Sequence, residues 1–216
     1  MFRKAFVTIA GCMFSTLIPA FAAENQAQLA SEVRQAENFY GQARYGYSLS
    51  LLDKHARDPS TVFLIGRDYY MLGDFKRANI YLKKAIAAAP ETSEYFDWLG
   101  RAYARRAETS NPLSAVILSK KARQAFERAV QLNPKNSEAV SDLFDYYLES
   151  PRLLGRSYER AGNVAERMSA INRDEASFEE WRLAGKRQPL QTGEQAAGKS
   201  SGPTPKDLGA LVRSVR

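Results

Sequence analysis

Residues 77–90, RANIYLKKAIAAAP, and residues 123–134, RQAFERAVQLNP, carry one pattern of side chains in one register. Ala78, Leu82, Ala85 and Pro90 in the first stretch correspond to Ala122, directly before the second stretch, and to Phe126, Ala129 and Pro134 within it. A second shared pattern precedes each stretch: Val62, Ile65, Gly66 and Tyr69, and then Phe96, Leu99, Gly100 and Tyr103. A looser third copy has Val140, Leu143, Phe144 and Tyr147, followed by Ala161, Ala165 and Met168. Small and large apolar residues that recur about every 34 residues predict helix pairs stacked into a solenoid.

These stretches resemble the tetratricopeptide repeat (TPR) family, whose pattern is a large apolar residue, Leu-Gly, Tyr, Ala, Phe, Ala and Pro. The resemblance is close over residues 59–136 and weaker to residue 188. It implies an all-α fold, a right-handed α-solenoid of antiparallel helix pairs, which holds a protein partner and needs no cofactor. The side chains agree with this, because Gly66 and Gly100 allow helices to approach closely and Pro90 and Pro134 end the second helix of a pair.

The chain divides into four parts by composition and pattern. We expect a signal peptide over 1–22, a degenerate helical repeat over 23–58, TPR-like repeats over 59–188 and a disordered basic tail over 189–216. Phe178, Trp181 and Ala184 suggest a final helix that shields the last repeat. About nine helices and no strand are expected, near residues 27–41, 44–56, 60–72, 75–88, 93–107, 113–132, 137–149, 157–171 and 175–187.

The N-terminus has the features of an export signal. Arg3 and Lys4 precede an uncharged run, and residues 20–22 (AFA) supply the small residues that a signal peptidase recognises, with cleavage between Ala22 and Ala23. The alternative is a lipobox at residues 9–12 (IAGC), in which Cys12 would carry the lipid anchor. Both interpretations place the body outside the cytoplasm, in the periplasm of a Gram-negative cell or exported.

The second repeat contains an insertion over residues 105–119 (RRAETSNPLSAVILS), with Asn111 placed to cap a helix that starts at Pro112. An elbow between helices and a projection that contacts a partner are both compatible with it. In the tail, residues 207–216 (DLGALVRSVR) place Leu208, Leu211 and Val212 on one helical face. The segment is either a frayed end or a short docking peptide, because so short a helix is not stable alone.

Composition excludes several classes of protein. The only cysteine, Cys12, lies in the segment expected to be removed, and the only histidine, His55, stands near a helix C-terminus that favours a cation. The mature chain therefore lacks a Cys or His zinc site and a thiol nucleophile. The net charge of +7 is concentrated in residues 101–128 and 182–216. This distribution argues against a nucleic-acid binder and allows contact with an anionic membrane surface or an acidic partner.

In the TPR family the first helix of each pair lines a concave groove. The matching positions of this chain with candidate binding roles are Phe63, Arg67, Tyr70, Asp97, Trp98, Arg101, Arg105, Asp142 and Asp145. We expect one half of the groove to be aromatic and cationic and the other half acidic, which suits an extended protein or peptide segment. Phe63 and Arg67 stand where chaperone-binding relatives use Lys and Asn, so binding of a chaperone C-terminus is not expected.

The sequence therefore predicts a non-catalytic protein-interaction scaffold of the bacterial cell envelope. Two alternatives are open. One is a lipoprotein assembly factor anchored through Cys12. The other is a metal-dependent enzyme that uses Asp142, Asp145 and Glu149, which share a helix face. No nucleophile elbow, phosphate loop or metal motif supports the enzyme.

Overall fold

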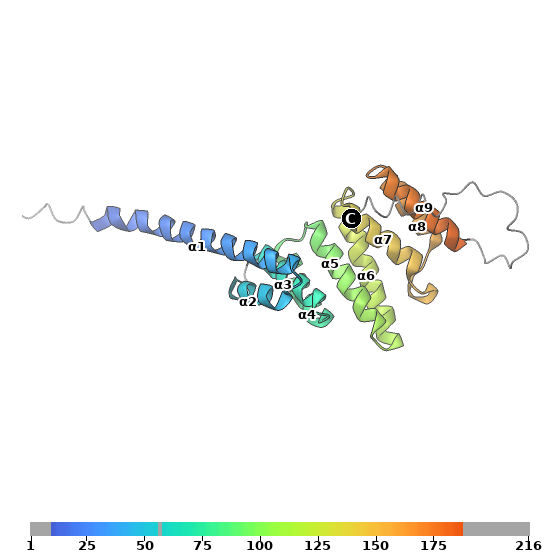
Figure 1. Ribbon diagram of the computed structural model, residues 1–216, viewed down its shortest axis with the longest axis horizontal. Helices are drawn as coiled ribbons and strands as arrows, with labels where there is room; N and C mark the ends of the chain where they lie inside the picture. The colour runs from blue at the N-terminus through green and yellow to red at the C-terminus, as the bar shows by residue number, and fades with distance from the viewer. Residues whose placement is uncertain (1–9, 56–57, 188–216) are drawn as a thin grey trace, which may run out of the picture.

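The computed structural model describes residues 10–55 and 58–187. These residues form α-helices and two short 3₁₀ helices and contain no strand, which confirms the all-α solenoid (Figure 1). The elements are α1 (Ala10–Gly41), α2 (Tyr45–Leu52), η1 (Asp53–His55), α3 (Pro59–Met71), α4 (Phe75–Ala88), α5 (Ser93–Glu108), α6 (Pro112–Leu132), α7 (Ser137–Glu149), η2 (Arg152–Leu154), α8 (Tyr158–Ser169) and α9 (Arg173–Arg187).

Side-chain caps fix where the helices of the repeats begin. The Asp58 carboxylate accepts a hydrogen bond from the Thr61 backbone N–H at 3.0 Å, and the Asn136 side chain accepts one from the Ala139 N–H at 3.2 Å. Asn111 caps α6 in the same way through the Ser114 N–H, and Pro112 is the first residue of that helix, as predicted. These caps satisfy N–H groups that have no partner within the helix.

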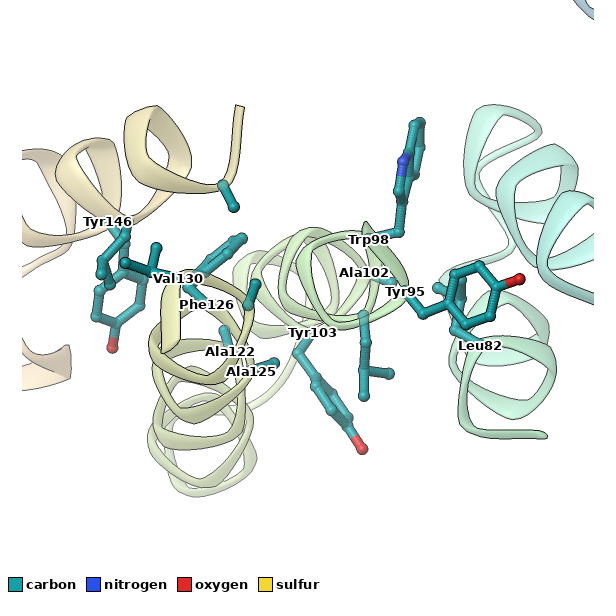
Figure 2. Packing of buried hydrophobic residues seen from close by; sticks show 14 of the residues in the cluster. Leu82, Tyr95, Trp98, Ala102, Tyr103, Ala122, Ala125, Phe126, Val130 and Tyr146 are labelled. Atoms are coloured by element: carbon teal, nitrogen blue, oxygen red, sulfur yellow. The ribbon is translucent and has the colours of Figure 1, made fainter. Parts of the chain in front are cut away.

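The helices pack as consecutive pairs, α1 with α2, α3 with α4, α5 with α6 and α7 with α8. Two glycines set the closest approaches. A Cβ at Gly66 would lie 2.9 Å from the Leu82 side chain, and a Cβ at Gly100 would lie 2.6 Å from the Phe126 ring. Figure 2 shows the result for α5 and α6, where Ala122, Ala125 and Phe126 meet the α5 helix. The small-residue pattern of the repeats is thus the pattern of contacts between paired helices.

The first helix is longer than the expected 27–41, because α1 starts at Ala10 and projects from the body as a single rod (Figure 1). The alanine-rich residues 20–30 favour continuation of the helix, since alanine has the highest helix propensity. The predicted cleavage site between Ala22 and Ala23 lies within this rod, while Arg3 and Lys4 lie outside the described residues. Within residues 10–55 and 58–187, no helix has the length and apolar character needed to cross a bilayer.

The second predicted helix, 44–56, is divided into α2 and the 3₁₀ turn η1. His55 was expected only to stand near a helix C-terminus. In the structure it also contacts α1, because its Nε2 lies 2.7 Å from the Glu32 Oε2. Buried Ala36 of α1 and Leu52 of α2 complete the contact between these helices. In the region predicted as a degenerate repeat, α1 and α2 pack as a helix pair, and the His–Glu contact joins η1 to α1.

The final helix caps the last repeat, but through residues other than those expected. Ala176, Glu179 and Leu183 are the buried side chains of α9, whereas Phe178 and Trp181 are 36% and 50% exposed. The expectation that Phe178, Trp181 and Ala184 shield the repeat is therefore wrong. The buried face includes the carboxyl group of Glu179, which forms an ion pair with Arg182 at 2.8 Å. The prediction looked for apolar residues at helical spacing and therefore could not recognise a buried face that contains a charged residue. The predicted tail, 189–216, lies outside the described residues.

Candidate partner-binding groove

The first helices of successive pairs form a row, in which α3 lies beside α5, α5 beside α7 and α7 beside α9. We call these four helices the inner row. All nine candidate residues lie on its helices α3, α5 and α7. The structure therefore brings the predicted residues together on neighbouring helices, but their exposure differs from expectation.

Two of the aromatic candidates are buried. Phe63 is 4% exposed and stacks on Tyr95, with 4.5 Å between ring centroids. Trp98 is 8% exposed and meets Tyr70 edge to face at 5.3 Å, and Figure 2 shows Trp98 and Tyr95 leaving α5 on different sides. The expectation that Trp98 lies in the open groove, at a position free of helix packing, is wrong, because its ring is buried against α3. The inner helices approach closely enough for Phe63 and Trp98 to fill the contact between α3 and α5.

Three arginines of α3 and α5 lie over aromatic rings. The Cζ of Arg67 is 3.8 Å from the centroid of Tyr40, that of Arg101 is 4.8 Å from Trp98, and that of Arg105 is 5.6 Å from Phe75. Cation–π contact holds each guanidinium in place while part of it remains accessible. Among the three, Arg105 has the most exposed side chain, and its ion pair with Glu108 lies at the surface.

Arg101 joins the cationic and acidic halves of the predicted groove. It pairs with Asp97 on its own helix at 3.0 Å, and with Asp142 and Glu138 of α7. We call Asp142, Asp145 and Glu149 of α7 the acidic stripe. The two halves are not separate charged surfaces, because Arg101 neutralises Asp142, the first residue of this stripe. This contact also fixes α5 against α7.

Helix α9 neutralises the remainder of the acidic stripe. Arg182 lies 2.6 Å from Asp145 and 3.4 Å from Glu149, and Lys186 lies 2.9 Å from Glu149. The metal alternative needs Asp142, Asp145 and Glu149 to converge on an ion, but each instead has a cationic partner. No group of three or more potential metal ligands occurs within residues 10–55 and 58–187.

Burial changes the protonation of the carboxyl groups in the inner row. Desolvation, and then the nearby charge of Asp142, raises the pKa of Asp97 to about 8. Desolvation also raises the pKa of Asp142, although Arg101 opposes this. At neutral pH Asp97 therefore keeps its proton and can donate a hydrogen bond to Asp142, so that Arg101 faces one neutral carboxyl group beside the carboxylates of Asp142 and Glu138.

A cleft of about 770 Å³ opens between α5, α6, α7 and η2. Apolar side chains that include Ala104, Ala115 and Phe126 line it together with Tyr70, Tyr146 and the charged groups of Arg105, Glu108, Asp145 and Glu149. The insertion builds one wall, since residues from Arg105 to Ser119 contribute to the lining from both α5 and α6. Five of the nine predicted residues line this cleft, namely Tyr70, Arg101, Arg105, Asp142 and Asp145, and Arg105 and Asp145 are the more exposed of the four charged ones.

The insertion packs as a helical turn, as predicted, because Ala115 and Leu118 are buried. Sequence reasoning missed what fixes the opposite wall. The Tyr146 hydroxyl donates to the Leu154 carbonyl of η2 at 2.6 Å and contacts the Ser119 hydroxyl at 2.8 Å. Tyr146 occupies an ordinary apolar position of the repeat, so nothing in its spacing distinguishes it from a core residue.

Known proteins resemble this chain in structure rather than in sequence. No family model matches the sequence, and no curated protein is significantly similar to it. A thermophilic TPR protein from Thermus thermophilus, TTC0263, superposes with a TM-score of 0.59 at 18% identity, over 73% of this chain and 86% of that one. MamA MSR-1 gives a TM-score of 0.54 at 17% identity, over 73% and 84% of the two chains.

A second MamA structure, AMB-1, gives a TM-score of 0.51 at 15% identity and covers 75% of this chain and 87% of that one. At these identities the likeness concerns the fold. It agrees with the paired helices, with their close contacts at Gly66 and Gly100, and with the inner row described above. The chain has the fold of tetratricopeptide repeat proteins, as its repeats predicted.

Proposed function

We propose that this protein is a non-catalytic interaction scaffold that binds an extended protein segment in the cleft between α5, α6, α7 and η2. The observation that carries the proposal is the combination of an apolar lining with accessible charges of both signs in one concavity. Arg105 stands on α5, and Asp145 and Glu149 stand on α7. Such a cleft suits a peptide with apolar residues between an acidic and a basic one, whose charges would compete with the partly exposed ion pairs of Arg105 with Glu108 and of Asp145 and Glu149 with α9.

The burial of Trp98 changes the residues on which binding should depend. Tyr70 and Arg105 line the cleft, whereas Trp98 holds Tyr70 in place from behind through the edge-to-face contact. Arg101 is occupied by carboxylates of its own chain. The partner therefore meets mainly Tyr70 and Arg105 among the predicted aromatic and cationic residues.

The test compares two charge reversals of full-length chain used as bait in periplasmic extract. Arg105→Glu changes the cleft, and Arg128→Glu makes the same change on an exposed position of α6 outside the cleft lining. A partner recovered by wild type and by Arg128→Glu should bind Arg105→Glu roughly 30-fold more weakly, if Arg105 contributes about 2 kcal/mol. Titration of the purified partner measures this ratio. Equal affinity for the three baits would refute binding in the cleft.

Export to the bacterial cell envelope is the second part of the proposal, and it rests on the signal-like residues 1–22. A lipid anchor at Cys12 is the alternative route to the same compartment.

Contact with an anionic membrane surface is favoured by the outer face of α6, where Leu113, Val116 and Ile117 are exposed next to Lys120 and Lys121. The wild-type protein should co-sediment with phosphatidylglycerol vesicles but not with phosphatidylcholine vesicles. Binding to the phosphatidylglycerol vesicles should weaken in a Lys120→Glu, Lys121→Glu variant.

A further inference from the structure

Basic side chains without an ion pair gather on the outward faces of α4 and α6. Six of them are exposed and have no carboxylate partner within residues 10–55 and 58–187, namely Lys76, Lys83 and Lys84 of α4 and Lys120, Lys121 and Arg128 of α6. We call these six cations the basic outer surface. Helix α4 contains no acidic residue, and the one in α6, Glu127, is held by the Tyr147 hydroxyl at 2.6 Å and by Arg160. The positive charge of this surface is therefore uncompensated.

The two helices lie on the same side of the inner row. α4 contacts α3 and α5, and α6 contacts α5 and α7. Figure 2 shows Leu82 of α4 and Ala122 of α6 on the side of α5 that faces away from Trp98. Because Leu82 and Ala122 are buried against the inner row, the exposed cations of both helices point away from it. The six cations thus belong to one side of the solenoid.

The inner row has a different balance of charge. α3 and α5 contain equal numbers of acidic and basic residues, and α7 contains four acidic residues and no basic one. The central arginines of this row, Arg101 and Arg182, are held by carboxylates. An extended anionic partner is consequently attracted to the outer side of the solenoid rather than to the inner row.

Exposed aliphatic side chains accompany the cations. Leu113 and Ile117 of α6 are 76% and 52% exposed, and Ile80 of α4 is 53% exposed. Five of the six cations are lysines, whose compact charge on a flexible stem suits mobile lipid phosphates, whereas an arginine fork suits a fixed carboxylate. Aliphatic side chains among lysines match the boundary between the headgroups and the acyl chains of an anionic bilayer. The combination favours a membrane over an acidic protein.

We infer that α4 and α6 together lie on an anionic bilayer and that the cleft between α5, α6, α7 and η2 then opens away from it. Ala115 and Ser119, through which α6 lines the cleft, stand on the opposite side of that helix from Leu113 and Ile117, at 3.6 residues per turn. One helix therefore contacts lipid and cleft on two different faces. The inference rests on the membrane contact proposed for α6, adds α4 to it and gives the molecule an orientation.

Binding of the full-length chain to phosphatidylglycerol vesicles tests the contribution of α4. Each basic residue at an anionic surface contributes about fivefold to binding, so Lys83→Glu with Lys84→Glu should bind roughly 30-fold more weakly than wild type. The matched control, Arg34→Glu with Arg173→Glu, makes the same change of charge at exposed positions of α1 and α9 and should bind like wild type.

Three outcomes of this titration would overturn the inference. Equal weakening in both double variants would mean that net charge alone drives binding. Weakening by Lys120→Glu with Lys121→Glu, but not by the α4 variant, would confine the contact to α6 and leave the proposed membrane contact intact. Wild-type binding to poly-glutamate but not to the vesicles would reject membrane contact altogether and assign the surface to an acidic protein. None of these measurements involves a cleft partner, so cleft binding stands or fails separately.

Tryptophan quenching by brominated phosphatidylglycerol tests the orientation. Ile117→Trp places a tryptophan on the lipid side of α6, and Leu153→Trp places one at an exposed aliphatic position of η2, which forms a wall of the cleft. On brominated vesicles, Ile117→Trp should lose emission relative to wild type, whose own tryptophans are buried Trp98 and Trp181 of α9, and Leu153→Trp should not. Equal quenching of the two added tryptophans, or none of either, would refute the orientation. Circular dichroism at 222 nm verifies that each variant is folded.

Discussion

At the scale of single residues, Asp97 is the group whose protonation is most strongly coupled to folding. It is 1% exposed and faces Arg101 of its own helix and Asp142 and Glu138 of α7. Its pKa is about 8 in the folded chain and near 3.8 when unfolded. Between these values the unfolded state releases the proton while the folded state retains it. The contribution of Asp97 to stability is therefore present below about pH 4 and is lost as the pH rises toward 8.

The Asp97→Asn variant should reveal this dependence, because its amide cannot ionise. We expect its Tm relative to wild type to increase between pH 5 and pH 9. Asp53→Asn, at an exposed position of η1, serves as the control. Parallel Tm–pH curves for wild type and Asp97→Asn would mean that Asp97 is ionised throughout this range.

Trp98 illustrates how burial separates a structural residue from a binding residue. Trp98→Ala should destabilise the protein by about 3–5 kcal/mol, since it removes a buried aromatic ring between α3 and α5. Arg105→Ala, which loses a surface ion pair and one cation–π contact, should change stability by about 1 kcal/mol or less. Urea unfolding curves measure both. If Trp98→Ala kept the wild-type midpoint, Trp98 would belong to the groove after all.

At the scale of elements, the hydroxyl of Tyr146 fixes η2 as a wall of the cleft. Tyr146→Phe keeps the ring but removes the donor to the Leu154 carbonyl and the contact with Ser119. We expect a loss of about 1 kcal/mol, because the Leu154 carbonyl and the Ser119 hydroxyl each lose one partner but keep their hydrogen bond to each other. Trypsin should also cut faster after Arg152, which lies in η2. Tyr81→Phe on α4 is the matched control, and faster cleavage in both variants would show that the effect is not specific to the Tyr146 hydroxyl.

The elements differ in how well spacing predicts them. α4 and α7 begin and end at the predicted residues, because Asp74 and Asn136 cap their N-termini and a proline follows two residues after each helix. The face of α9 was predicted wrongly because its buried stripe includes Glu179, whose pKa rises to about 7 through desolvation. A carboxyl held by Arg182 in a helix interface depends on tertiary neighbours, and the repeat pattern contains no information on them.

At the scale of the whole molecule, contacts within a helix pair were predictable and contacts between pairs were not. Gly100 and Phe126 reveal their contact through a fixed spacing in sequence. Trp98 and Arg101 meet residues of neighbouring pairs, so their burial depends on how pairs are rotated against each other. The positions of Tyr70, Arg105 and Asp145 within their own helices were enough to identify them as candidates. That Arg182 and Lys186 neutralise the acidic stripe depends on how α9 packs on α7, and the sequence did not reveal it.

Export makes a prediction about the projecting helix. Cleavage after Ala22 would leave residues 23–41 of α1, including Glu32 and Ala36, which contact η1 and the core. The exported protein should therefore begin Ala23-Glu24-Asn25 and keep the Tm of the uncleaved chain, since the contacts to the body remain. Mass spectrometry of the periplasmic fraction and calorimetry measure the two. A lipid-modified Cys12 in the membrane fraction would support the lipobox instead.

The solenoid should also transmit local damage along its axis. Replacing Gly100 by Leu places a side chain where even a Cβ would be 2.6 Å from the Phe126 ring. α5 and α6 must then separate, at a cost of roughly 1–3 kcal/mol or more. Each pair is stabilised mainly by its neighbours, so amide exchange should accelerate in α3, α4, α7 and α8 as well as in the altered pair. Gly46→Leu is the control, because a Cβ at Gly46 meets no atom within 4 Å. Faster exchange confined to α5 and α6 would show that the pairs unfold independently, and the chain would then behave as separate helix pairs rather than as one cooperative array.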